Sequence, residues 1–246
     1  MRIGITERGD ASRDFSWTQT INNVDGAILI TKHITPEFIQ RLMQCNKPVI
    51  VHATCTGWGG TWLEPNVPTY ENQLNNIIQL IEAGFPKNRI VLRIDPIIPT
   101  EEGIQRFRHV IDKAYSLKLI PDLRIRISVM DQYPHVRQRL LSSGHNLFYN
   151  GSFQASTSDM LFLDAVLSGY SLTFEACAES NLDNVEHVGC ISSKDINILG
   201  LSLSEMSVNP QNRRGCLCLN CKTELLNNKR QCENSCLYCY WKGTQA

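Results

Sequence analysis

The sequence has no excess of charge of either sign. Lysine and arginine number 24 together, as do aspartate and glutamate, so the formal net charge is zero. Proteins held on nucleic acid by bulk electrostatic attraction usually carry a basic excess, so the balance argues against that class. No stretch approaches the roughly 18 apolar residues that a membrane span requires, and residues 1–15 do not resemble a signal peptide. We therefore expect a cytoplasmic protein without a membrane partner.

The chain also lacks internal repeats, low-complexity tracts and a glycine-rich phosphate loop. Instead, short apolar runs alternate with helical patterns that begin near Thr35, Leu74, Thr100 and Ser158. Buried parallel strands have such continuous apolar runs, which here cover residues 2–6, 26–31, 48–54, 89–97, 123–130 and 171–176. The alternation predicts an α/β fold, a partial parallel β/α barrel of about six strands over residues 1–177. The cysteine-rich residues 178–246 are expected to pack on the barrel mouth.

Polar side chains follow the carboxyl end of each predicted strand, where α/β proteins concentrate their chemistry. Any one of them could be structural, and Arg93 could simply pair with Asp95 across a strand end. Together they predict a site on one rim. The rim set is Glu7, Arg8, Asp10, Lys32, His33, His52, Thr54, Cys55, Arg93, Asp95, Ser128, Asp131, Tyr133, Glu175 and Cys177.

A loop with three glycines and two tryptophans, residues 54–68, lies beside the same rim. Trp58 and Trp62 could pack back onto the barrel or could form an adaptable wall that covers a flat substrate. We favour the wall, since glycines beside large apolar surfaces allow a loop to adapt.

Cysteine is abundant where the rest of the composition is ordinary. Six of the ten cysteines lie after residue 215. Without a secretion signal, such a cluster is more typical of metal binding than of disulfides. Cys232, Cys236 and Cys239 have the spacing C-x₃-C-x₂-C, whereas zinc sites usually pair two hooks to reach four ligands. Three thiolates can instead hold three irons of a cubane cluster and leave the fourth iron open.

This spacing, with Tyr238 directly before the last cysteine, resembles the signature of the radical S-adenosylmethionine superfamily. That superfamily normally carries the motif near its N-terminus. The whole chain also resembles a poorly characterised family related to spore photoproduct lyase, which has the motif at its C-terminus. The matching stretches are residues 31–38, 56–68, 92–99, 127–133, 177–180, 189–196, 213–218 and 236–240.

The resemblance implies an enzyme that reductively cleaves S-adenosylmethionine at a 4Fe–4S cluster and removes a hydrogen atom from a substrate. It implies cluster ligation by Cys232, Cys236 and Cys239 and a reductant such as flavodoxin or ferredoxin. A nucleobase or nucleotide is the substrate we expect from the relation to spore photoproduct lyase. Within this hypothesis we assign catalysis to Arg93, Asp95 and Asp131, and cofactor binding to Tyr238, Glu7, Arg8, Lys32, Ser128 and Glu175.

Four further thiols, Cys177, Cys190, Cys216 and Cys218, could ligate a second centre. Four thiolates suit either a second 4Fe–4S cluster or a structural zinc ion. We favour the cluster, because the C-x-C spacing is unusual for zinc, and Cys221 is a possible substitute ligand. Cys45 is expected to be a small buried hydrophobe.

Two other classes of protein remain open at this point. A zinc-stapled nucleic-acid-binding module without catalysis would use Lys222, Lys229, Arg230 and Lys242 around the C-terminal cysteines. A pure electron carrier would need the cluster but no polar strand-end rim. The zero net charge speaks against the first, and the rim against the second.

Overall fold

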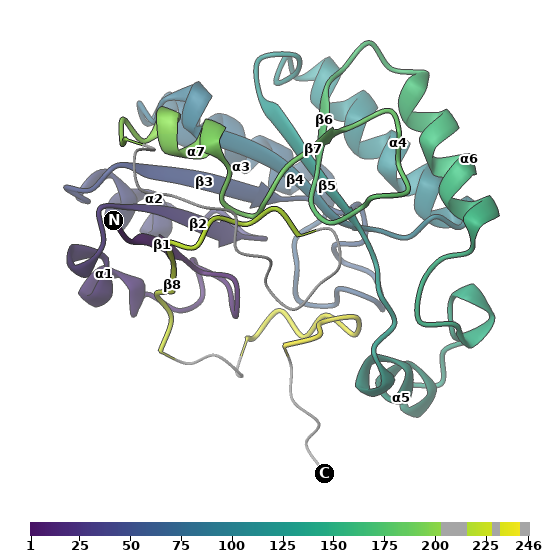
Figure 1. Ribbon diagram of the computed structural model, residues 1–246. Coiled ribbons are helices and arrows are strands. Elements are labelled where there is room, and N and C mark those ends of the chain that lie inside the picture. Colours follow the sequence, from purple (N-terminus) through teal and green to yellow (C-terminus); the bar gives the residue numbers. More distant parts are fainter. Residues whose placement is uncertain (203–215, 228–231, 242–246) are drawn as a thin grey trace.

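Eight strands form one parallel sheet in the computed structural model, which describes residues 1–202, 216–227 and 232–241 (Figure 1). The strand order is β7-β6-β5-β4-β3-β2-β1-β8, so the two strands latest in sequence form the two edges. The strands are β1 (Ile3–Ile5), β2 (Gly26–Thr31), β3 (Val49–Thr54), β4 (Ile90–Ile97), β5 (Arg124–Val129), β6 (Phe174–Ala176), β7 (Glu186–His187) and β8 (Lys222–Glu224).

Much of the sheet is apolar on both faces, as parallel sheets require when each face is covered, and charged residues of β4, β5 and β6 lie on the inner face. All six residues of β3 are buried. Val51 faces a large core formed with the helices, whereas its neighbour Ile50 packs with Ile3, Ile28 and inner-face residues from the C-terminal part. The continuous apolar runs therefore arise because alternate side chains of each strand enter two different cores.

The described helices cover the outer face of the sheet, except for Ser193–Ile198, which packs on the inner face, and Pro134–Ser142, which packs against the C-terminal loop. They are α1 (Trp17–Thr20), α2 (Pro36–Met43), α3 (Tyr70–Glu82), α4 (Glu101–Ser116), α5 (Pro134–Ser142), α6 (Thr157–Ser168) and α7 (Ser193–Ile198), with short 3-10 turns at Ile21–Asn23, Lys87–Arg89 and Tyr149–Gly151. The hydroxyl of Thr35 accepts a hydrogen bond from the Phe38 amide, and Thr100 does the same for Gly103. Each threonine satisfies an amide that the first helical turn leaves unpaired.

This architecture confirms the predicted partial barrel of parallel strands. The six expected strands and four expected helices are present, with ends that differ by a few residues. The expected number of strands is too low, because β7 and β8 join the sheet from the cysteine-rich part of the chain. None of the helices within the described ranges is long and apolar enough to cross a membrane.

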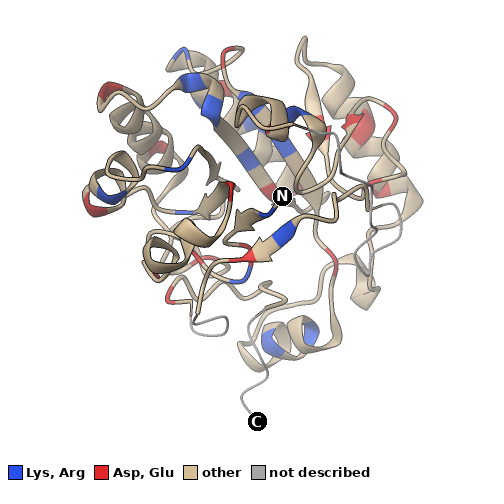
Figure 2. Cartoon of the chain, turned by 60° about the vertical axis from the view of Figure 1, so that its left-hand side comes forward, with Lys and Arg blue, Asp and Glu red and all other residues tan. Residues whose placement is uncertain are grey.

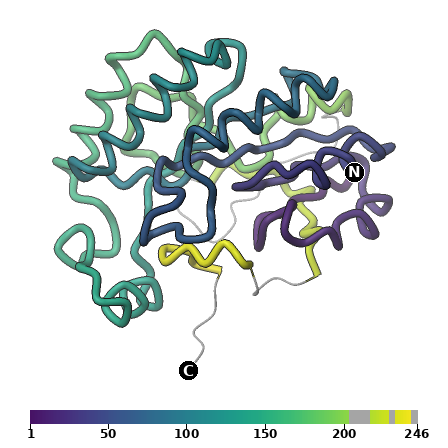
Figure 3. Tube along the Cα trace, turned by 180° about the vertical axis from the view of Figure 1, so that it is seen from behind, coloured from purple at the N-terminus to yellow at the C-terminus, as the bar shows by residue number. Residues whose placement is uncertain are grey.

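The C-terminal part of the chain covers the inner face and the open end of the barrel. Ile191, Ile196, Leu199 and Leu219 pack against the inner face of β1, β2 and β3. Figures 1 and 3 both show residues 232–241 beside the carboxyl ends of the strands, between the N-terminal elements and α5. Residues nearly 230 positions apart in sequence are therefore neighbours at this end.

Candidate functional site

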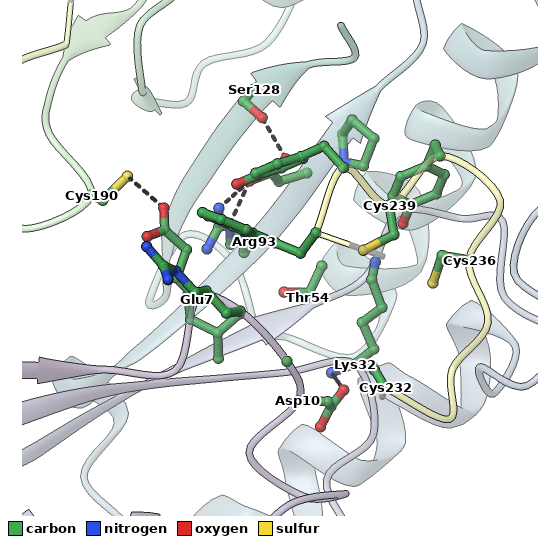
Figure 4. Close-up of a pocket in the computed structure, with 18 of the residues that line it drawn as sticks. Glu7, Asp10, Lys32, Thr54, Arg93, Ser128, Cys190, Cys232, Cys236 and Cys239 are labelled. Carbon is green, nitrogen blue, oxygen red and sulfur yellow. Dashed lines mark hydrogen bonds and ion pairs between the residues drawn. The ribbon is translucent and has the colours of Figure 1, made fainter. Parts of the chain in front are cut away.

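A cavity of about 530 Å³ lies at the carboxyl ends of the strands (Figure 4). The C-terminal loop forms its opposite wall. This size falls within the range of small-molecule sites. The lining contains most of the predicted rim and the predicted metal ligands, namely Glu7, Arg8, Asp10, Lys32, Thr54, Arg93, Asp95, Ser128, Asp131, Tyr133, Cys177, Cys190, Cys216, Cys218, Cys232, Cys236, Tyr238 and Cys239. The structure thus brings strand-end polar residues and seven thiols to one cavity, while the roles assigned to them stay predictions.

Residues 232–239, which we call the signature loop, are attached to the barrel at several points. Asn234 donates a hydrogen bond to Asp10, which also accepts from the Lys32 amide. On α5, the Arg139 guanidinium donates to the carbonyls of Leu237, at 3.1 Å, and Cys239. Arg139 was not predicted as a site residue, because α5 has only nine residues and its buried side chains, Val136 and Leu140, form a weak apolar stripe. These bonds place the loop over the cavity without using its thiols.

Glu64 is a fully buried carboxylate that joins three parts of the site. It accepts hydrogen bonds from Lys32 Nζ at 2.7 Å, from Thr56 Oγ1 at 2.8 Å and from the Tyr238 hydroxyl. Burial alone would lower the pKa of Lys32, but the Glu64 carboxylate and the nearby Cys236 raise it. Lys32 is therefore held as a cation at the cavity wall. This role of Glu64 could not be predicted from the sequence, because Glu64 is a single acidic residue in a tryptophan-rich loop.

Arg93 and Asp95 form an ion pair at the end of β4, with Arg93 Nε 2.7 Å from Asp95 Oδ2. The Ser128 hydroxyl donates to the other oxygen of Asp95. Burial acts to raise the pKa of Asp95, but the charge of Arg93 and the Ser128 hydrogen bond outweigh it, so the pKa is lowered. Asp95 is thus a carboxylate at neutral pH, and the pairing considered from the sequence does occur.

Glu7 lies on the other side of the cavity, where it forms an ion pair with Lys222 of β8. Burial raises the pKa of Glu7, and the neighbouring Cys190 acts in the same direction. Beside this pair the Arg8 guanidinium lies over the Trp241 ring, 4.6 Å from its centroid. The cavity wall therefore offers charged groups of both signs and an aromatic surface.

Cys177, Cys190 and Cys218, which we call the inner thiol group, lie close together. Their three sulfur atoms are all within 4.8 Å of one another, and the sulfurs of Cys177 and Cys190 are 3.4 Å apart. All ten cysteines are free thiols. This group could hold a metal ion or cluster. The cysteines of the signature loop are also described, yet they do not form a group of this tightness.

The two sets of thiols lie on different walls of the cavity. Figure 4 shows Cys190 on one side, and Cys236 and Cys239 on the other. Burial raises the pKa of Cys232 to about 11 and also raises that of Cys236. These thiols are neutral in the absence of a ligand, so loading a metal or cluster here releases protons.

Four members of the predicted rim lie outside the lining, namely His33, His52, Cys55 and Glu175. Glu175 was expected to bind a cofactor, but it is 1 % exposed and pairs with Arg124 and Arg126, each at 2.8 Å. Asp195 completes this buried network. Glu175 is in register with Arg126 of β5, and its carboxylate joins this buried network inside the barrel instead of lining the cavity.

His52 and Cys55 are buried for different reasons. His52 shares the inner face of the sheet with Arg93 and Arg126. Burial is the main reason why its pKa lies well below 6.5, and the positive charges of these arginines act in the same direction. Cys55 packs in the outer core. Cys45 also contacts that core, as expected of a small hydrophobe.

The expected substrate wall of tryptophans is not what the structure shows. Trp58 is buried, and the Arg106 guanidinium lies 4.2 Å from its ring centroid. Trp62 stacks on His145, with ring centroids 3.9 Å apart. Neither tryptophan lines the cavity. The loop instead packs against the signature loop, where Leu63 accepts a backbone hydrogen bond from Leu237.

Basic and acidic residues are intermixed along the chain in the view of Figure 2. Of the four basic residues that a nucleic-acid-binding module would use, Lys222 is paired with Glu7, and Lys229, Arg230 and Lys242 lie outside the described residues. Nothing in the described part favours that alternative.

The fold and the cavity define an α/β partial barrel with a thiol-lined, charged site at the carboxyl ends of its strands. Residues 12–241 match the family described as "Domain of unknown function (DUF1848)", and the chain belongs to this family. A comparison with curated proteins finds none that matches.

Proposed function

We propose that this protein is a radical S-adenosylmethionine enzyme whose 4Fe–4S cluster is held by Cys232, Cys236 and Cys239. The observation that carries the proposal is the meeting of these three thiols with the charged strand ends in one cavity. The charged strand ends could position what a cluster at these thiols binds.

The residues present fit such a cluster. Each thiolate of a cubane binds a different iron, so its ligands lie farther apart than the ligands of a single ion, and the signature cysteines are more widely spaced than the inner thiol group. The backbone of Ser235 has a φ of 55°, which helps the loop to curve between Cys232 and Cys236. The bound cluster and S-adenosylmethionine would supply a 5′-deoxyadenosyl radical.

The surrounding residues position and shield what binds in the cavity. Lys32, held as a cation by Glu64, lies where it would pair with the carboxylate of the methionine moiety. Tyr238 lines the same wall and would lie beside the adenine, with its hydroxyl fixed by Glu64. Asp95 and Asp131 would accept hydrogen bonds from ribose hydroxyls or the methionine amine. The assignments of Lys32, Asp95 and Asp131 follow from charge and from place in the cavity, whereas that of Tyr238 is what the resemblance to the radical S-adenosylmethionine superfamily implies.

For the substrate we propose a nucleobase or nucleotide, and for the electron donor a flavodoxin or ferredoxin. The aromatic rings of Tyr133, Tyr240 and Trp241 in the lining support a flat substrate, since such rings stack on bases. Arg8, next to Trp241, would meet an anionic group of that substrate.

The test is anaerobic reconstitution with iron and sulfide, followed by reduction in the presence of S-adenosylmethionine. We expect release of 5′-deoxyadenosine by the wild-type protein and none above background by Cys236→Ala. The Cys45→Ala variant is the matched control, because it removes a thiol that lies outside the cavity. Equal release by the wild type and Cys236→Ala would overturn the proposal.

A further inference from the structure

We propose that the inner thiol group, with Cys216 as fourth ligand, binds a single tetrahedral zinc ion that staples the two edges of the open barrel together. This proposal replaces the second 4Fe–4S cluster favoured from the sequence. It does not depend on the radical chemistry proposed above.

The spacing of the sulfurs points to one ion. Zinc–thiolate bonds of about 2.3 Å at tetrahedral angles place two sulfurs about 3.8 Å apart. Cys177 and Cys190 are 3.4 Å apart, and all three sulfurs of the group lie within 4.8 Å. A cubane would have to force these thiols apart, because each would bind a separate iron. The thiols therefore already form a mononuclear site.

Cys216 is the residue best placed to complete four ligands. It is buried, lines the same cavity and lies two residues before Cys218, although its sulfur is not part of the group within 4.8 Å. Residues two apart on an extended chain point to the same side, and Leu217 between them is 41 % exposed. Cys221 instead packs in the inner apolar core with Ile3.

The surroundings suit a site with several thiolates. The Cys190 backbone amide donates a hydrogen bond of 3.1 Å to the Cys218 sulfur, the type of contact that orients metal-bound thiolates. Lys222 and Arg93 supply positive charge near Cys190. Four thiolates around Zn²⁺ carry a net charge of about −2, so these cations lower the cost of burying it.

The position of the group explains what such an ion would do. Cys177 follows β6 and Cys190 follows β7, at one edge of the sheet, whereas Cys218 precedes β8 at the opposite edge. The chain segments are already in close contact here, since a Cβ on Gly189 would lie 2.5 Å from the Leu217 carbonyl oxygen. A metal at this point connects the two edge strands of the sheet, β7 and β8, which do not pair with each other.

The experiment uses the full chain with all three signature cysteines changed to alanine, so that no radical-type cluster can form. We expect about one zinc per chain and no iron or sulfide in this variant after purification. Adding Cys190→Ser or Cys218→Ser should remove the zinc, and Cys216→Ser should weaken its binding. Adding Cys45→Ala or Cys221→Ala should leave the zinc in place. Replacement by Co²⁺ should give the intense visible spectrum of tetrahedral thiolate cobalt.

Two results would overturn the proposal. One is about four irons with sulfide in the folded variant, which shows a second cluster. The other is a folded variant that carries no stoichiometric metal, whether Cys177 and Cys190 are free thiols or are joined by a disulfide. If the triple variant does not fold, Cys236→Ala replaces it, and the zinc count with and without Cys190→Ser decides between the same outcomes. All of these readouts are independent of S-adenosylmethionine cleavage.

Discussion

The two cysteine sets of this protein differ in how their thiols reach the cavity. The signature cysteines come from one short loop, whose backbone is anchored by hydrogen bonds to Arg139 and Leu63. The inner thiol group comes from three segments far apart in sequence and converges to within 4.8 Å. Structural metal sites take all their ligands from the protein, whereas catalytic sites keep an open coordination position.

We propose a reactive role for the signature cysteines and a structural role for the inner thiol group. On our account, the signature loop brings reactivity to the carboxyl ends of the strands. On the same account, a zinc ion held by the inner thiol group would connect the two edges of the open sheet. Both functions meet at one cavity, and the predictions below aim to separate them.

The largest expected effect is that removing a cysteine from one set abolishes the metal of that set and leaves the metal of the other set in place. Cys236→Ala should lose iron and all 5′-deoxyadenosine release, but should keep about one zinc per chain. Cys190→Ala should lose zinc and about 3 kcal/mol or more of stability, but should still bind iron when folded at low temperature. Metal analysis and chemical denaturation measure both. Loss of both metals in each single variant would show one shared site instead of two.

The next effect concerns the buried carboxylate that anchors the signature loop. Glu64→Gln keeps the shape but leaves the ammonium of Lys32 buried without its ionic partner, so we expect a loss of about 3 kcal/mol. The iron content should also fall, because Tyr238 loses a charged acceptor. Denaturant titration and iron analysis provide the readouts.

Glu37→Gln is the matched control for this variant. It breaks the exposed ion pair with Arg41 on α2 and should cost only about 0.3–0.5 kcal/mol. Equal effects of the two substitutions would contradict the anchoring role of Glu64.

A smaller effect should follow from a methyl group placed between the stapled edges. In Gly189→Ala the new Cβ would lie 2.7 Å from the Cys218 Cα, so the two segments must move apart. We expect about a tenfold loss of zinc affinity, measured by competition with a chelator. Gly169→Ala, at an ordinary backbone angle after α6, should bind zinc like the wild type. Unchanged affinity in Gly189→Ala would show that the close approach does not control the site.

The smallest effect is a pH dependence of stability from His52, which lies inside the barrel below the cavity. Its pKa is held well below 6.5 by burial and neighbouring arginines. The unfolded histidine therefore binds a proton below a pH of about 6.5 that the folded one does not, so stability falls as pH falls below that value. His52→Gln should reduce this slope in denaturation curves measured across the same pH range. An identical slope would assign the effect to other groups.

Much of the barrel could be predicted because its strands are continuous apolar runs that sequence alone displays. The edge strands β7 and β8 could not, since two or three residues such as Glu186 and His187 become a strand only by pairing with a neighbour. Helix α5 was missed because it is short and its exposed face dominates its pattern, with only Val136 and Leu140 buried.

The candidate site shows the same division. The spacing of the signature cysteines and the polar strand ends pointed to one cavity, and the structure places them there. Glu64 and Arg139 act through contacts with residues about 100 or more positions away, which no local pattern encodes. Glu175 lies outside the cavity because its carboxylate pairs with Arg124 and Arg126 in the buried network, and no local pattern encodes that pairing.

The most direct test of two distinct centres is anomalous diffraction from crystals of the anaerobically purified protein, recorded at the zinc and iron absorption edges. We predict a zinc peak among the sulfurs of Cys177, Cys190 and Cys218. Iron peaks are expected only beside Cys232, Cys236 and Cys239. Iron at both positions would contradict the zinc staple, and zinc beside the signature cysteines without iron would contradict the proposed radical chemistry.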